Sequence, residues 1–184
     1  DWGKEVHVKT AKGTDIKFSI RGRRAISNSG DYSKPGTGGN IPVGEVYIAP
    51  VEGTASGKLV IDGTIKHRWG ATIVQDPVTI LIEKGKITEI RGGFEAKLLE
   101  RTFDWAAANA KNKENVRVVG EFGIGTNPKA KLIGATILDE KTINTAHIAF
   151  GSNYWFGGDI YSILHVDQIF KDPIIEVDGK KINI

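Results

Sequence analysis

The sequence predicts a β-rich α+β domain in which a mixed or antiparallel sheet packs against one main amphipathic helix. Three observations lead to this class. Short segments that alternate polar and apolar residues recur along the 184-residue chain, with turn-forming residues between them. Only residues 95–110 instead repeat their apolar residues at three- and four-residue steps. A hydrophobic content of 40% is enough for one substantial core, which favours a single domain.

The amino-terminal half is predicted to be mostly strand. "EVHVKT" and "DIKFSI" flank "AKGT" and predict a hairpin with one buried face. Residues 21–40, "RGRRAISNSGDYSKPGTGGN", are rich in Gly, Ser and Pro and predict a long loop, a kind of segment that tends to be functional or mobile. Further strands are expected at residues 44–48, 57–65, 77–83 and 86–91, with "EKGK" as the turn between the last two.

The carboxy-terminal half contains the predicted helix. In "EAKLLERTFDWAAANA" the apolar positions are Leu98, Leu99, Phe103 and Ala106, so the helix is expected to cover one face of a sheet. Strand character returns at residues 116–119, and three closely spaced glycines follow in "GEFGIGTN", where backbones can approach closely. "TAHIAFG" and "SILHVDQIF" predict two more strands, and "IIEVDGKKINI" predicts a closing hairpin.

Composition excludes several classes of protein. The chain has 25 basic and 22 acidic residues, a net charge of +3, which is a weak argument for nucleic-acid binding. It has no cysteine, so any metal must be held by carboxylate and imidazole groups. Neither a membrane span nor a signal peptide is visible, which predicts a cytoplasmic protein. The start at Asp1 and the absence of Met predict a fragment that lacks a preceding segment.

Five residues are candidate metal ligands. His165 and Asp167 lie two positions apart in "LHVDQ", so on a strand both side chains point to one face. Glu121, among glycines, would be costly to bury without a partner. The alternatives are a salt-bridged His165, a His147 that is part of the core, and a Glu45 that faces solvent. "LDEK" is interpreted as a solvated turn.

Together these residues form a nitrogen and oxygen ligand set of the kind that binds zinc, cobalt or manganese. The set is Glu45, Glu121, His147, His165 and Asp167. Five ligands exceed the needs of one tetrahedral site, so two divalent metal ions that share a carboxylate are predicted. Such a pair lowers the pKa of a bridging water and polarises a carbonyl, which indicates metal-assisted hydrolysis.

Ordered motifs then resemble the aminopeptidase T family, thermophilic leucyl metallo-aminopeptidases. The motifs are "NIPVGEVYIAPVEGTASGKLVIDGTI", "GEFGIGTNP", "ILDEKTINTAHIAFG" and S-x-x-H-x-D, and the resemblance covers residues from about 10 to 182. It implies that residues 1–184 are a single metallopeptidase catalytic-type domain, the carboxy-terminal half of a larger two-domain protein without its amino-terminal domain. It also implies a homodimer.

The resemblance assigns roles to individual residues. It places the metal ligands on the same five residues and the catalytic tyrosine on Tyr154. The implied reaction is release of amino-terminal residues, of leucyl type, from peptide substrates by a metal-activated water. Glu121 is expected to act as general base as well as ligand, and the Tyr154 hydroxyl to donate to the tetrahedral oxyanion. The chain departs from the family pattern at Asp159, at Val166 and in the short interval between His147 and His165.

Two other hypotheses compete with the peptidase. A catalytically inactive metal-binding or structural domain of the same fold predicts metal occupancy without turnover. A nucleic-acid module would use Arg21, Arg23 and Arg24, but the aromatic residues expected beside such arginines are missing. Membrane and nucleic-acid partners are therefore not expected.

Overall fold

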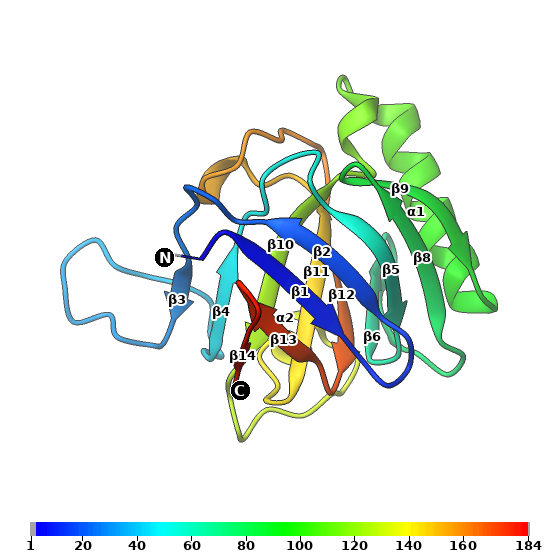
Figure 1. Ribbon diagram of the computed structural model, residues 1–184. Coiled ribbons are helices and arrows are strands. Elements are labelled where there is room, and N and C mark those ends of the chain that lie inside the picture. Colours follow the sequence, from blue (N-terminus) through cyan, green and yellow to red (C-terminus); the bar gives the residue numbers. More distant parts are fainter. Residues whose placement is uncertain (1–2, 184) are drawn as a thin grey trace.

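The structure is a computed structural model that describes residues 3–183. Asp1, Trp2 and Ile184, the ends of the predicted domain 1–184 and of its closing hairpin, lie outside the described residues. Two antiparallel sheets form two layers, and one long helix lies beside them (Figure 1). The prediction of a β-rich α+β domain with one main helix is confirmed. Among residues 3–183, no helix has the length and apolar character needed to cross a membrane.

Each sheet has seven strands. The first runs in the order β14 (Lys180–Ile182), β13 (Ile174–Val177), β1 (Glu5–Lys9), β2 (Asp15–Ser19), β5 (Ser56–Ile61), β8 (Val78–Glu83) and β9 (Lys86–Arg91). The second runs in the order β3 (Ile26–Asn28), β4 (Glu45–Ile48), β10 (Val119–Gly125), β11 (Thr145–Gly151), β12 (His165–Lys171), β6 (Thr64–His67) and β7 (Gly70–Ile73). The chain crosses between the sheets several times, so strands distant in sequence become neighbours.

The hydrophobic core lies between the two sheets. Phe18 of β2 and Phe122 of β10 meet across it with ring centroids 5.1 Å apart. Along each strand alternate residues point to opposite faces, so the residues between the core positions face outward. In the second sheet Phe122, Ile148 and Val166 belong to the core, and the neighbours on either side of each point away from it.

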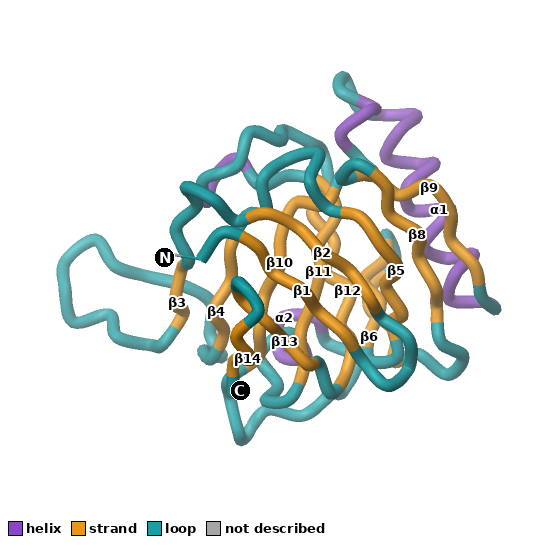
Figure 2. The backbone as a smooth tube through the Cα atoms, viewed as in Figure 1, coloured by secondary structure: helices purple, strands orange, loops and turns teal. Residues whose placement is uncertain are grey.

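Helix α1 (Phe94–Asn109) packs against β6, β8 and β9 and therefore contacts strands of both sheets. It buries Leu99, Phe103 and Ala106, and Phe103 meets Phe150 of β11 edge-on at 5.8 Å. The remaining helical segments are short: α2 (Thr136–Asp139), η1 (Lys113–Asn115) and η2 (Tyr154–Phe156). Outside these helices the chain consists of strands joined by loops and turns (Figure 2).

Several predicted elements agree with the structure. The first hairpin, the strands over residues 44–48, 77–83 and 86–91, and the two strands that carry the histidines are present within a residue or two, apart from β12, which begins only at His165. The closing hairpin turns at Asp178 and Gly179, which both have positive φ (49° and 76°), as a two-residue turn of type I′ requires.

Three predictions of secondary structure are wrong. The single strand expected over residues 57–65 is two strands, β5 and β6, in different sheets, because the chain turns at Gly63. The strand expected at residues 116–119 lies later, as β10, and runs through the glycines. The predicted loop 21–40 contains β3, and the segment from there to β4 projects from the body (Figures 1 and 2).

Candidate metal centre

The candidate site lies on the outer face of the second sheet, across four adjacent strands. Residues directly opposite one another on paired strands point to the same face. Ala149 of β11 pairs with Glu121 of β10 on one side and with Asp167 of β12 on the other. Gly123 pairs with both Tyr47 and His147, and Gly151 pairs with His165. Strand pairing therefore brings four sequence-distant segments onto one surface.

Small residues make room for the cluster. A Cβ atom on Gly123 would lie 2.1 Å from Nε2 of His147, so the imidazole occupies the space above this glycine. A Cβ on Gly125 would lie 2.0 Å from the carbonyl oxygen of Thr142. The glycines of β10 thus let the chemical groups approach the sheet, which is the close approach that the sequence predicted.

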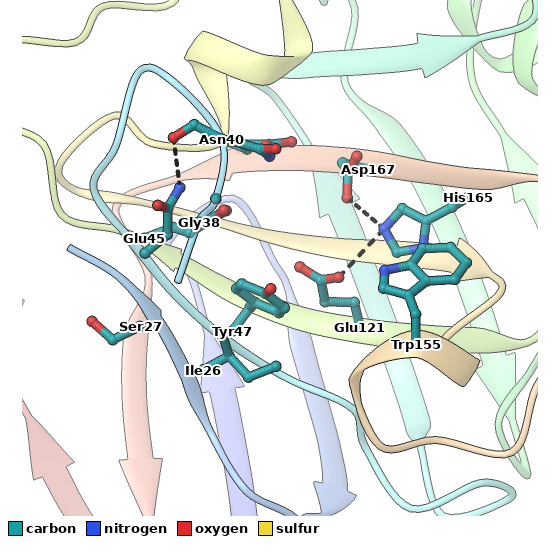
Figure 3. Close-up of a pocket in the computed structure, with 13 residues that line it drawn as sticks. Ile26, Ser27, Gly38, Asn40, Glu45, Tyr47, Glu121, Trp155, His165 and Asp167 are labelled. Atoms are coloured by element: carbon teal, nitrogen blue, oxygen red, sulfur yellow. Dashed lines mark hydrogen bonds and ion pairs between the residues drawn. The ribbon is translucent and has the colours of Figure 1, made fainter. Parts of the chain in front are cut away.

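Glu121 joins the two histidines. Its Oε1 lies 3.1 Å from Nε2 of His147, and its Oε2 lies 3.3 Å from Nε2 of His165. His165 Nε2 is also 3.2 Å from Oδ1 of Asp167 (Figure 3). Glu45 is at the other side, with Oε2 3.8 Å from His147 Nε2. The structure brings all five predicted ligands together, in two sets of three that share Glu121: Glu45, Glu121 and His147, and Glu121, His165 and Asp167.

A hydrogen bond fixes the orientation of His165. Its Nδ1 donates to the carbonyl oxygen of Ser152 at 2.7 Å, so Nε2 is the nitrogen directed at the carboxylates. His147 is fully buried, and its Nδ1 has no hydrogen-bond partner among the residues that the structure describes. Both rings therefore point Nε2 toward Glu121.

Neighbouring charges in the site strongly shift one another's pKa values. Burial lowers the pKa of His147, but the hydrogen bond and charge of Glu121 raise it to about 9. For His165 burial again lowers the pKa, but Asp167 and then Glu121 raise it to about 11. Burial raises the pKa of Asp167, and the hydrogen bond and charge of His165 lower it to about 2. Without metal, the carboxylates hold protons on both imidazoles at neutral pH.

Two further buried groups belong to the cluster, and the sequence interpretation missed them. Lys141 is completely buried and donates from Nζ to Oε1 of Glu45 at 2.7 Å and to Glu140. Burial and the charge of Asp167 raise the pKa of Glu140 to about 7. The interpretation of "LDEK" as a solvated turn is wrong: Asp139, Glu140 and Lys141 are all buried. Asp139 accepts hydrogen bonds from the backbone of Ile133 and Gly134 and, at 2.7 Å, from the hydroxyl of Thr64 on β6, which holds this turn against the sheet.

A pocket of about 260 Å³ opens onto the cluster. Figure 3 shows residues that line it: Glu121, Asp167 and His165 lie on one side, and Glu45 lies beside Gly38 and Asn40 of the loop between β3 and β4 on another. Tyr47 and Trp155 supply aromatic surface. The structure places Tyr154 outside this lining, with 65% of its surface exposed and its ring packed edge-on against Tyr161.

The loop that carries Trp155 is held by a partly buried ion pair. Arg23 donates to Glu52 and to the carbonyl oxygen of Gly157. Oε1 of Glu52 accepts from Nδ2 of Asn153 and from the backbone of Asp159, both at 2.9 Å. Arg23, one of the arginines considered for nucleic-acid binding, is therefore a structural residue that anchors the wall of the pocket.

The donor set fits a divalent cation. Four buried or nearly buried carboxylates (Glu45, Glu121, Glu140 and Asp167) surround one permanent cation, Lys141. This excess of negative charge requires either protonated histidines or a bound cation. Carboxylate oxygen and imidazole nitrogen are the ligands that such metals as iron, zinc and manganese use. The side chains of the cluster therefore have the chemistry needed to hold a divalent metal ion.

Replacing Gly123 with alanine tests whether His147 needs the space above this residue. The added Cβ would overlap the imidazole, so we expect metal affinity to fall at least tenfold and unfolding to be easier by about 1–3 kcal/mol. The measurements are metal content and urea denaturation. Gly38→Ala is the control, because a Cβ there meets nothing within 4 Å. Unchanged metal affinity in Gly123→Ala would show that His147 does not contribute to the site.

The fold and the site define a class: an α+β domain with a candidate metal-binding cluster of carboxylates and imidazoles on the outer face of an antiparallel sheet. Residues 1–183 match the family described as NicX, 2,5-dihydroxypyridine 5,6-dioxygenase, and the chain belongs to this family. The chain is 27% identical over 189 residues to 2,5-dihydroxypyridine 5,6-dioxygenase of Pseudomonas putida KT2440. This match covers 97% of the chain and 52% of that protein, so the chain spans about half the length of the curated relative it matches.

Solved structures agree with this assignment. The 2,5-dihydroxypyridine dioxygenase of Pseudomonas putida KT2440 superposes with a TM-score of 0.85 at 25% identity, covering 99% of this chain and 54% of that one. Wild-type AmpT of Thermus thermophilus superposes with a TM-score of 0.74 at 21% identity, covering 98% and 48%. The second likeness is one of fold alone.

The comparisons correct the predicted function. The resemblance to aminopeptidase T holds for the fold, but the sequence family is that of a dioxygenase. The predictions of a hydrolase, of leucyl aminopeptidase activity and of peptide substrates are therefore wrong. The roles of Glu121 as general base and of Tyr154 as oxyanion donor belonged to peptide hydrolysis and lose their basis. The predicted homodimer and the predicted missing amino-terminal domain stay predictions.

Proposed function

We propose that this chain is the metal-binding part of a ring-cleaving dioxygenase that acts on a small dihydroxylated aromatic heterocycle of the 2,5-dihydroxypyridine type. The observation that carries the proposal is the cluster of carboxylates and imidazoles at the bottom of a small pocket, in a chain of the dioxygenase family. The volume of about 260 Å³ lies near the lower end of the range for small-molecule pockets, roughly 300–1,000 Å³, and suits one substituted ring.

The chain's side chains would hold the metal and orient the substrate. Glu121, His165 and Asp167 form a set with one imidazole and two carboxylates that leaves the pocket side open. His147 and Glu45 stand behind Glu121 and complete the buried half of the cluster. Iron(II) in an open nitrogen and oxygen site supplies the electron transfer that lets O₂ react with an organic substrate. Trp155 and the loop between β3 and β4 would shield the ring from water.

The reaction needs no external reductant. One carbon–carbon bond of the ring breaks, and each of its two carbons gains one atom of O₂, so the ring supplies all the electrons that reduce the oxygen. The Lys141 ammonium remains charged beside Glu45 and Glu140, because those two carboxylates raise its pKa against the effect of burial. The ammonium thereby holds Glu45 in place through the hydrogen bond to its Oε1.

The charge balance favours one metal ion over the two predicted from the sequence. With neutral histidines, the four carboxylates and Lys141 sum to about −3, or to about −2 when Glu140, whose pKa is about 7, is protonated. One divalent cation leaves the cluster between about −1 and neutral, whereas two would leave about +1 to +2 in a buried site. The proposal is therefore a single divalent ion per chain.

Oxygen consumption tests the function directly. The full-length protein, loaded anaerobically with iron(II), should consume one O₂ per 2,5-dihydroxypyridine and bind close to one iron per chain. With ¹⁸O₂, mass spectrometry should find both labelled atoms in the product. Incorporation of one labelled atom, or none, would contradict a dioxygenase, and leucyl-p-nitroanilide provides the control for hydrolysis.

A further inference from the structure

Tyr47 lines the pocket. Neither the spacing of the motifs nor the family resemblance assigned this tyrosine a role. Tyr47 lies two residues after Glu45 on β4, so both side chains point to the outer face of the sheet. It is half-buried and lines the same pocket as Glu121, His165 and Asp167. In Figure 3 its ring lies among these groups, on the same side of the pocket as Glu121.

The sheet gives Tyr47 a fixed place. Its partner on β10 is Gly123, which has no side chain, and the next residue across the sheet is His147. The ring packs edge-on against Phe156 with centroids 5.5 Å apart, and Phe156 in turn packs edge-on against His165. This packing limits the rotation of the phenol and holds it at the wall of the pocket.

The hydroxyl is prepared to donate. The Tyr47 phenol carries its proton at neutral pH, because the ordinary pKa of a tyrosine is about 10. No residue from 3 to 183 forms a hydrogen bond with this hydroxyl. Among the described residues this phenol is therefore a donor without a partner, in the lining of the pocket that holds the carboxylates.

We propose that Tyr47 is a substrate-binding residue that donates a hydrogen bond to one ring oxygen of a hydroxylated aromatic substrate. The inference rests on the proposed function for the substrate class and on the pocket for the residue. Tyr154, which carries the same functional group, is exposed outside the lining and has no such role. The two tyrosines therefore form a matched pair for a test.

The test measures binding without turnover. The full-length protein with iron(II) is titrated anaerobically with 2,5-dihydroxypyridine by calorimetry, in the wild type, Tyr47→Phe and Tyr154→Phe. We expect Tyr47→Phe to raise the dissociation constant at least tenfold, as loss of one hydrogen bond to a charged or polarised oxygen does, with metal content and melting temperature unchanged. Tyr154→Phe should stay within twofold of the wild type.

A second set of ligands separates a direct hydrogen bond from a structural effect. 2-Hydroxypyridine and 3-hydroxypyridine each lack one ring oxygen. The ligand that lacks the bonded oxygen should bind weakly to the wild type and lose nothing further in Tyr47→Phe. Equal losses for all three ligands in Tyr47→Phe, or a larger effect of Tyr154→Phe, would overturn the proposal.

The outcomes also separate this inference from the proposed function. Tyr47-dependent binding with no oxygen consumption would refute the dioxygenase and leave the role of Tyr47 intact. Oxygen consumption with no effect of Tyr47→Phe on binding or on KM would do the reverse. A wild-type protein that binds none of the three pyridines would overturn the inference, because the substrate class would be wrong.

Discussion

Glu121→Gln is expected to remove most of the bound metal and to lower any metal-dependent activity at least about a hundredfold. Glutamine keeps the shape of the side chain but removes the charge that faces both histidines, at 3.1 Å and 3.3 Å. Glu121 is the residue common to both possible ligand sets, so neither set survives its loss. Elemental analysis of the purified protein and oxygen uptake measure the two effects.

The control for this variant is Glu89→Gln. Glu89 is partly exposed on β9 and forms an ion pair with Arg91 on the same strand, so its replacement should leave metal content and activity unchanged. Urea denaturation in the presence of a chelator shows whether Glu121→Gln is still folded. A folded Glu121→Gln protein with normal metal content would show that Glu121 is not a ligand and that the metal lies elsewhere.

The clustering of the five predicted ligands follows from the periodicity of strands. His165 and Asp167 share a face because they are two residues apart, and this is visible in the sequence. The sequence does not show that β10, β11 and β12 are neighbours, because strand order depends on long-range pairing. Nor does it show their register, which aligns Glu121, Ala149 and Asp167. Only the resemblance to a known fold connected these segments before the structure did.

The sequence pattern around the missed residues either gave no indication of a role in the site or indicated solvent exposure. Lys141 and Glu140 are charged residues next to turn-forming ones, a pattern that usually indicates solvent exposure. They are buried because Asp139 binds the preceding backbone and folds the turn onto the sheet. Tyr47 did have a signal: it is two residues from Glu45, so a strand that aims the glutamate at the site also aims the tyrosine there.

The chemistry was predicted wrongly because the same ligands serve different reactions. Carboxylate and imidazole groups hold metals both for hydrolysis and for reaction with O₂, so a ligand set alone does not distinguish the two. The features that differ lie around the ligands, in the walls of the pocket. Asp159 and the short interval between His147 and His165 belong to one such wall, the loop that carries Trp155.

Lys141→Met is expected to lower the free energy of unfolding by about 3–5 kcal/mol in the metal-free protein. The methionine fills a similar volume, but it leaves Glu45 and Glu140 buried without their cation. Glu140 escapes part of this cost because its pKa of about 7 allows it to take up a proton, whereas Glu45 loses the ammonium that donates to its Oε1 at 2.7 Å. The measurement is urea denaturation at pH 8 with a chelator present.

Two further variants decide whether the loss comes from unpaired charge. In Lys141→Met with Glu140→Gln one of the two carboxylates is neutral, so the double variant should be more stable than Lys141→Met alone, although each change is destabilising or neutral by itself. Lys171→Met serves as the surface control: Lys171 is partly exposed and 3.9 Å from Asp62, so its loss should cost less than about 1 kcal/mol. If Lys141→Met lowered the free energy of unfolding by no more than Lys171→Met does, the buried ammonium would not hold the carboxylates of the site. The metal alone would then organise them.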